Sequence, residues 1–176
     1  MSTLETNLIQ PSSGTTLTVG ASGDTLALGS GVVQSNLNYP AFRARKTSNQ
    51  NAATGTNVKI TFDTEDYDTD SAFADSKFTV PSGKAGKYFL NFLNRIRDGG
   101  NFAGEYSFYK NGSKEDRISI YHFGGSEQYQ SYGFTTTLNL SASDYIEVYV
   151  NHSASGNLEI NGGAGITLFQ GFRIGT

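Results

Sequence analysis

The feature that most constrains this chain is a period-two alternation of apolar and polar residues, which recurs from residue 39 almost to the C-terminus. Its apolar members are Phe42 and Ala44; Val58, Ile60 and Phe62; Ile118 and Ile120, followed by His122; and Ile146, Val148 and Val150. Successive side chains of a β-strand point to opposite faces, so each segment is predicted to be a strand with one face in a core. Runs of Gly, Asn, Ser and Asp separate these segments, and no stretch shows a sustained helical period. The sequence therefore predicts an all-β sandwich.

The composition agrees with strands and tight turns. The chain has 176 residues, of which 21 are Gly and three are Pro, and its aromatic residues are all Tyr or Phe. This length suits one domain with an extension. A net charge of -3 leaves no basic stripe to neutralise phosphates, so no nucleic-acid partner is expected. There is no cysteine for a disulfide or a thiolate site. We find neither a signal peptide nor an apolar span, and expect cytoplasmic synthesis without membrane insertion.

Residues 1–38 have a different pattern from the rest of the chain and are predicted to be an extended, Gly/Ser/Thr-rich anchoring segment. The stretch Gly14 to Gly20 returns nine residues later as Gly23 to Gly29. Within the two copies, the apolar residues that alternate with small ones are Leu17, Val19, Leu26 and Leu28. Two copies are too few to bury this face as a solenoid, so we expect it to pack against another chain. A flexible Gly/Ser linker is the alternative.

Two later segments, 88–93 and 166–174, are apolar on both faces of the predicted strand. One face must pack against the opposite sheet of the sandwich. The other face must be covered by something outside the domain. In the first segment, one face carries Tyr88, Leu90 and Phe92, and the other carries Phe89, Asn91 and Leu93.

Six short motifs occur in a fixed order between residues 41 and 174. They are Ala41-Phe42, Phe62-Asp63, Phe78-Thr79-Val80-Pro81 with Gly86-Lys87-Tyr88-Phe89-Leu90, Asn111-Gly112, the stretch from Leu138 to Ile146, and Phe169-Gln170-Gly171-Phe172. Together they resemble the globular head domain of the complement first-component q family, a relative of the tumour necrosis factor fold. Ser76 and Ser143 stand where that family has glycine, which affects turns only.

The resemblance implies that residues 39–176 form a ten-strand jelly-roll knob that assembles as a homotrimer and has no catalytic apparatus. Phe89, Asn91 and Leu93 would then line the threefold axis, with Phe169 as a further interface residue. The family sometimes binds calcium, and the acidic run within 65–75 offers oxygen ligands. Its spacing is not that of the twelve-residue calcium loop, so we interpret the run as a solvated loop and expect no metal and no cofactor.

The remaining candidate residues are histidines and tyrosines. His122 and His152 lack the context of a catalytic triad or a metal site, and we interpret them as core or interface residues. Tyr129 and Tyr132 lie in a polar, Ser-rich stretch of the kind that binding surfaces use. They are candidates for a ligand surface, and trimer packing is the open alternative.

The first 25 residues resemble the N-terminal start of tail-fibre and structural proteins of marine bacteriophages. With the knob, this resemblance predicts a phage virion surface protein: a trimeric fibre or knob that attaches through its N-terminal segment to capsid or tail proteins and binds a host-surface glycan or protein. Two alternatives remain. One is an architectural capsid decoration protein with no receptor, and the other is a polysaccharide depolymerase, which the absence of a defined acid pair disfavours.

Overall fold

The computed structural model describes residues 9, 13–14, 18–25, 30, 39–98, 100–123, 128–163 and 165–175. The chain divides into two compact units, residues 1–37 and residues 38–176. In the first unit, the backbone N–H of Ala21 donates to the Asp24 carboxylate (2.6 Å), and the N–H of Asp24 donates to the Ala21 carbonyl (3.0 Å), which closes a turn. Val19 is 64% exposed, whereas Leu17, Leu26 and Leu28 lie outside the described residues. The prediction that these four residues anchor the chain therefore stays a prediction.

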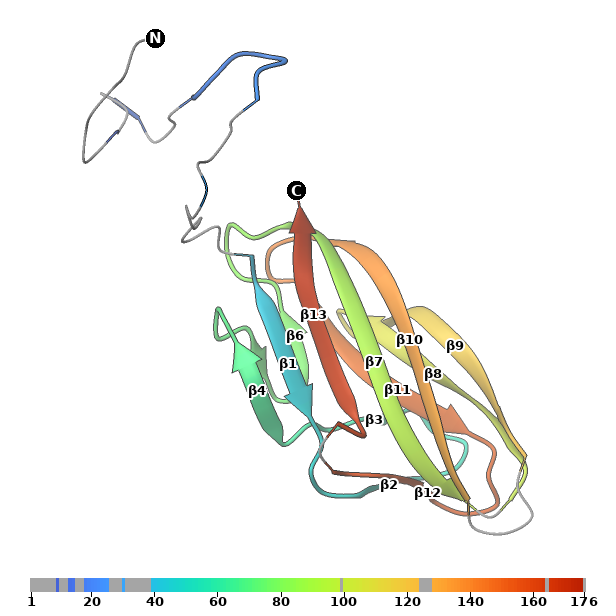
Figure 1. The fold of residues 1–176 in the computed structure, drawn as a ribbon. Coiled ribbons are helices and arrows are strands. Elements are labelled where there is room, and N and C mark those ends of the chain that lie inside the picture. The colour runs from blue at the N-terminus through green and yellow to red at the C-terminus, as the bar shows by residue number, and fades with distance from the viewer. Residues whose placement is uncertain are drawn as a thin grey trace. The chain divides into compact units, whose positions relative to one another are not determined.

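The second unit consists of two antiparallel sheets packed face to face (Figure 1). The first sheet has the order β4 (Thr64–Asp68), β1 (Ala41–Arg45), β13 (Leu168–Gly175), β7 (Gly86–Asp98) and β10 (Gln128–Leu140). The C-terminal end of β7 also pairs with β12 (Leu158–Ile160), and β12 pairs with β2 (Gln50–Ala52). The second sheet has the order β5 (Phe73–Ala74), β6 (Lys77–Thr79), β11 (Tyr145–His152), β8 (Phe102–Lys110) and β9 (Ser113–His122), and β3 (Val58–Lys59) also pairs with β11.

This architecture confirms the predicted all-β sandwich. The described residues form thirteen strands rather than the expected ten. The difference arises because turns divide several segments into strands of two or three residues, namely β2, β3, β5, β6 and β12. Among the described residues, no helix is long and apolar enough to span a membrane.

The core lies between the inner faces of the two sheets and is rich in aromatic rings. Phe42 stacks on Phe78 with a ring separation of 4.5 Å, and Phe169 meets Phe42 edge-on at 4.8 Å. Such pairs add to the free energy gained by burying the rings. The fully buried residues of β11 and β7 include Ile146, Val148, Val150, Tyr88, Leu90 and Phe92. The alternation therefore predicted the inner faces of both strands correctly.

A few polar groups also lie inside the sandwich. The hydroxyl of Tyr106 is fully buried and accepts a hydrogen bond from Nδ2 of Asn94 at 2.8 Å. Burial raises the pKa of Tyr106, and the Asn94 hydrogen bond only partly opposes this. His122 stacks on the ring of Phe102, and His152 is buried beside the same ring, so both histidines are core residues.

The domain is elongated along its strands. We call the end at which β1 begins and β13 ends the proximal pole, and the opposite end the distal pole. At the proximal pole, Gly86 lies beside both Leu140 and the end of β13. A Cβ at Gly86 would lie 2.2 Å from the carbonyl oxygen of Gly175, and its φ is +146°, so this position requires glycine. At the distal pole, β7 ends and β8 begins at Phe102, close to the ends of β9 and β11 (Figure 1).

Candidate interaction surfaces

The outer face of the first sheet carries a partly apolar surface. Phe89, Asn91 and Leu93 project from β7 away from the core, and each is partly buried. In β13 the residues that pair with them are Phe172, Gln170 and Leu168. The rings of Phe89 and Phe172 are 5.3 Å apart, and Nε2 of Gln170 donates to Oδ1 of Asn91 at 3.2 Å.

Phe172 and Ile174 lie at the end of β13 on this face and are 48% and 51% exposed. We call Phe89, Leu93, Phe172 and Ile174 the first-sheet patch. A sheet face that faces water is ordinarily polar, so this apolar patch is a candidate contact surface. Whether Phe89, Asn91 and Leu93 form a trimer interface stays a prediction.

Phe169 does not belong to this surface, and its assignment to the interface is wrong. Its side chain is fully buried and packs against Phe42, Phe62 and Phe108 in the core. Phe169 and Phe172 are three residues apart in a strand and therefore point to opposite faces. Phe172, which sequence reasoning missed, has the outward position. The motif Phe169-Gln170-Gly171-Phe172 allows either phenylalanine to face the core, and only the pairing of β13 with β7 shows that it is Phe169.

The two tyrosines proposed for a ligand surface lie on opposite faces of β10. Tyr129 is 57% exposed, and the guanidinium of Arg95 lies 4.5 Å from the centre of its ring. Tyr132 points inward against Tyr106, and its hydroxyl donates to the backbone carbonyl of Tyr121. The assignment of Tyr132 to a shared ligand surface with Tyr129 is therefore wrong, because an odd spacing in a strand separates two side chains.

The acidic run within 65–75 is held by local contacts. Asp66 forms ion pairs with Arg43 (3.1 Å) and Arg45 (2.6 Å), and the Asp68 carboxylate accepts the backbone N–H of Phe73 at 2.7 Å. In the part of the chain that the structure describes, no group of three or more His, Cys, Asp or Glu side chains is placed to hold a metal ion.

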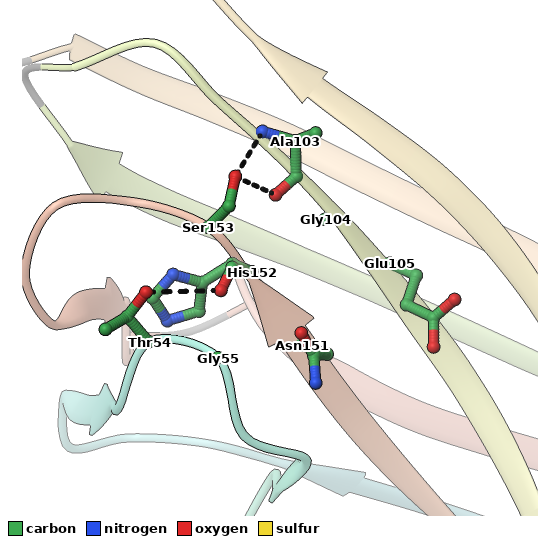
Figure 2. Close-up of a pocket in the computed structure, with 8 residues that line it drawn as sticks. All are labelled: Thr54, Gly55, Ala103, Gly104, Glu105, Asn151, His152 and Ser153. Atoms are coloured by element: carbon green, nitrogen blue, oxygen red, sulfur yellow. Dashed lines mark hydrogen bonds between the residues drawn. The ribbon is translucent and has the colours of Figure 1, made fainter.

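A pocket of about 600 Å³ lies on the outer face of the second sheet, near the distal pole. Figure 2 shows its three walls: the β2–β3 loop, the end of β11 and the beginning of β8. The lining residues are Thr54, Gly55, Ala103, Gly104, Glu105, Asn151, His152 and Ser153. The surface is hollow here because most of these residues are small. Sequence reasoning did not find this pocket.

Hydrogen bonds fix the walls of the pocket to one another. Oγ of Ser153 accepts from the N–H of Ala103 (3.1 Å) and donates to its carbonyl (3.0 Å), as Figure 2 shows. On the other side, the His152 carbonyl accepts the N–H of Gly55 (2.8 Å) and the hydroxyl of Thr54 (3.3 Å). The buried His152 ring bonds the Ala52 carbonyl through Nε2 (3.0 Å) and accepts the N–H of Ala154 at Nδ1 (3.3 Å). It therefore ties β11 to β2 and acts as a support rather than as a ligand group.

Two polar side chains on the sheet complete the pocket. The Glu105 carboxylate is paired with Lys114 and faces Arg117 at 3.7 Å. Nδ2 of Asn151 donates to Oδ1 of Asn57 at 3.0 Å, while Oδ1 of Asn151 has no partner among the described residues. The pocket thus presents a fixed carboxylate, an amide oxygen and two hydroxyls within one concave surface.

Aromatic rings lie next to the pocket on the same face. Tyr121 of β9 pairs with Ala103 of β8, so its ring projects beside the pocket, where it is 65% exposed. Further along this face, the rings of Tyr109 and Tyr149 lie 4.2 Å apart. Tyr149 and Asn151 share one face of β11 because they are two residues apart.

Comparison with known proteins identifies the fold. No protein-family model and no curated protein sequence matches the chain. Among solved structures, murine APRIL at pH 5.0 superposes with a TM-score of 0.59 and 12% identity, over 78% of this chain and all of that one. The globular domain of zebrafish complement 1qA protein matches with a TM-score of 0.52 and 18% identity, over 77% of this chain and 98% of that one. The globular unit of this chain therefore has a jelly-roll fold similar to those of the complement 1q globular domain and of APRIL.

Proposed function

We propose that this chain is a surface knob of a bacteriophage virion, which assembles as a homotrimer through the first sheet and binds a ligand on the host surface. Residues 1–38 attach the knob to capsid or tail proteins of the particle. The chain is synthesised in the host cytoplasm and has no enzymatic role. The single observation that carries the proposal is the exposed first-sheet patch on a jelly roll of this type.

The patch supports self-association for an energetic reason. Burial of an exposed Phe, Leu or Ile side chain contributes about 1.5–3 kcal/mol. Covering the four patch residues of each subunit therefore contributes several kcal/mol toward the cost of association. Asn91 and Gln170, which lie next to the patch residues on the same face, are hydrogen-bonded to each other and stay so when water is excluded. A heterologous contact of this kind closes into a ring when the rotation is threefold.

The phage assignment is supported by the sequence of the N-terminal segment, with its two nine-residue repeats and its resemblance to phage fibre proteins. The binding role is supported by the separation of two surfaces within the domain. The first sheet offers the patch for assembly, and the second sheet, on the opposite side of the core, keeps a polar pocket with neighbouring tyrosines.

Two experiments test the proposal. Sedimentation equilibrium of the full chain should give the mass of a trimer, and a folded monomer at micromolar concentration would contradict it. Electron microscopy of virions should place the protein on projecting knobs. A regular array flush with the capsid, together with no binding to host cells, would favour a decoration protein instead.

A further inference from the structure

We propose that the pocket between β8, β11 and the β2–β3 loop binds a neutral sugar residue of a surface glycan. This inference rests on the proposed function, which requires a host-surface ligand but does not name its chemistry. The volume of about 600 Å³ lies within the range of roughly 300–1,000 Å³ that small-molecule sites occupy. It is large enough for a sugar ring together with part of the next one.

The polar groups of the pocket match the edge of a sugar ring. Adjacent hydroxyls of a pyranose each donate one hydrogen bond and accept others. The Glu105 carboxylate and Oδ1 of Asn151 can only accept. The hydroxyls of Thr54 and Ser153 also act as acceptors, because their own hydrogens are donated to the carbonyls of His152 and Ala103. Glu105 and Asn151 are a registered pair on adjacent strands, so their side chains project from the same face of the sheet.

The ring of Tyr121 is placed to contact the apolar face of a sugar ring. One face of a pyranose presents C–H groups, which pack against an aromatic ring. Tyr121 is largely exposed and borders the pocket at Ala103, although nothing in the domain core requires an aromatic residue there. Tyrosine supplies such contact area at a low entropy cost, since it has only two side-chain torsions.

The charge of the pocket favours a neutral sugar over an acidic one. Glu105 is the only residue with a full charge among those that line the pocket. It forms ion pairs with Lys114 and Arg117, which do not line the pocket. An acidic sugar would place a second carboxylate beside Glu105 without a lining cation to compensate it, and like charges in one site repel. Uronic and sialic acids are therefore disfavoured, and neutral hexoses and N-acetylhexosamines are favoured.

The site is organised before any ligand binds. Glu105 and Asn151 lie on paired strands, and Ser153, Gly55 and His152 are hydrogen-bonded into the walls. Rigid walls reduce the ordering cost of binding. Because the pocket is open, we expect single-site affinities in the millimolar range, which a trimer with three pockets would raise through avidity.

The test uses the full chain on an array of neutral and acidic glycans, followed by ligand-observed NMR with methyl glycosides of glucose, galactose, mannose and N-acetylglucosamine. Wild-type protein should bind at least one neutral class. Tyr121→Ala and Asn151→Ala should each weaken that binding tenfold or more. Tyr67→Ala, which removes a half-exposed tyrosine from the first sheet, should leave it unchanged. Circular dichroism confirms that each variant is folded.

Three results would overturn the inference: no neutral glycan bound by the wild type, binding of acidic glycans alone, or equal losses in Tyr121→Ala and Tyr67→Ala. Failure of the proposed function is measured separately. If the chain is a trimer and binds host cells, but Tyr121→Ala and Asn151→Ala bind them as well as the wild type, the sugar site is wrong while the function stands. If the chain neither trimerises nor binds cells, the function itself is wrong.

Discussion

At the scale of single residues, the carboxylate of Asp63 shows how one acid can order a junction. It accepts the backbone N–H groups of Thr47 (2.8 Å) and Ser48 (3.0 Å) and the hydroxyl of Thr47 (2.7 Å). It thereby fixes the chain where it leaves β1. Burial acts to raise the pKa of Asp63, but the hydrogen bonds from Thr47, Ser48 and Thr64 outweigh it and hold the pKa at about 2.

This depressed pKa predicts acid sensitivity. In the unfolded chain an aspartate has a pKa of about 3.9, so the native carboxylate contributes stability above that pH. The contribution is lost as the pH falls through the folded value near 2. Asp63→Asn should therefore lower the unfolding free energy at pH 7 and flatten its decline between pH 4 and 2, as measured by urea unfolding. Glu115→Gln removes the same charge from an exposed strand position and should keep the wild-type slope. Identical slopes in both variants would refute the assignment.

A second prediction concerns the buried pair of Asn94 and Tyr106. Tyr106→Phe removes the hydroxyl that accepts from Asn94 and leaves a buried amide without its partner. Such a loss costs about 1–3 kcal/mol, whereas replacing both partners by apolar groups of similar shape is nearly neutral. Asn94→Leu combined with Tyr106→Phe should therefore recover most of the stability in urea unfolding. A double variant less stable than Tyr106→Phe alone would show that the pair is held by something other than this bond.

At the scale of elements, the spacing between β8 and β11 depends on Gly104. A Cβ at this position would lie 2.6 Å from the carbonyl oxygen of Asn151 and 3.2 Å from Cα of His152. The two strands approach each other where the pocket is formed, and a side chain would push them apart.

Gly104→Ala should therefore destabilise the domain by about 1–3 kcal/mol, the usual cost of overpacking. The displaced strands would also separate Glu105 from Asn151. Gly156→Ala is the matched control in the neighbouring loop, because a Cβ there would meet nothing within 4 Å. Thermal unfolding of both variants measures the difference, and equal melting temperatures would contradict the role of Gly104.

The strands also show what sequence patterns can and cannot predict. The faces of β7 were predictable because Tyr88, Leu90 and Phe92 form one apolar face, whereas the other face includes the polar residue Asn91. The face of β13 was not, because Phe169 and Phe172 are both aromatic and only pairing assigns one to the core. The pocket was beyond sequence reasoning for a different reason. It forms where Thr54 meets His152, which is 98 residues away, and small residues carry no pattern of their own.

At the scale of the whole molecule, the proposed trimer depends on the first-sheet patch. Phe172 is the best position to test it, because its side chain is half exposed and its loss leaves the core intact. Phe172→Asp would bury a charge without a partner in the proposed trimer, which costs several kcal/mol. The variant should sediment as a folded monomer. Tyr121→Asp, on the opposite sheet, should remain trimeric, and a trimeric Phe172→Asp variant would show that the patch is not the interface.

The antiparallel pairing of β1 with β13 also has a mechanical consequence. The chain enters the domain at Ala41 at the proximal pole, whereas the pocket lies near the distal one. Pulling on the entry point while the distal pole is held would load β1 along its own axis. The hydrogen bonds to β13 and β4 on its two sides would then bear the force in shear and share it, rather than open one after another. If the knob attaches a particle to its host as proposed, this geometry would keep the domain folded under tension.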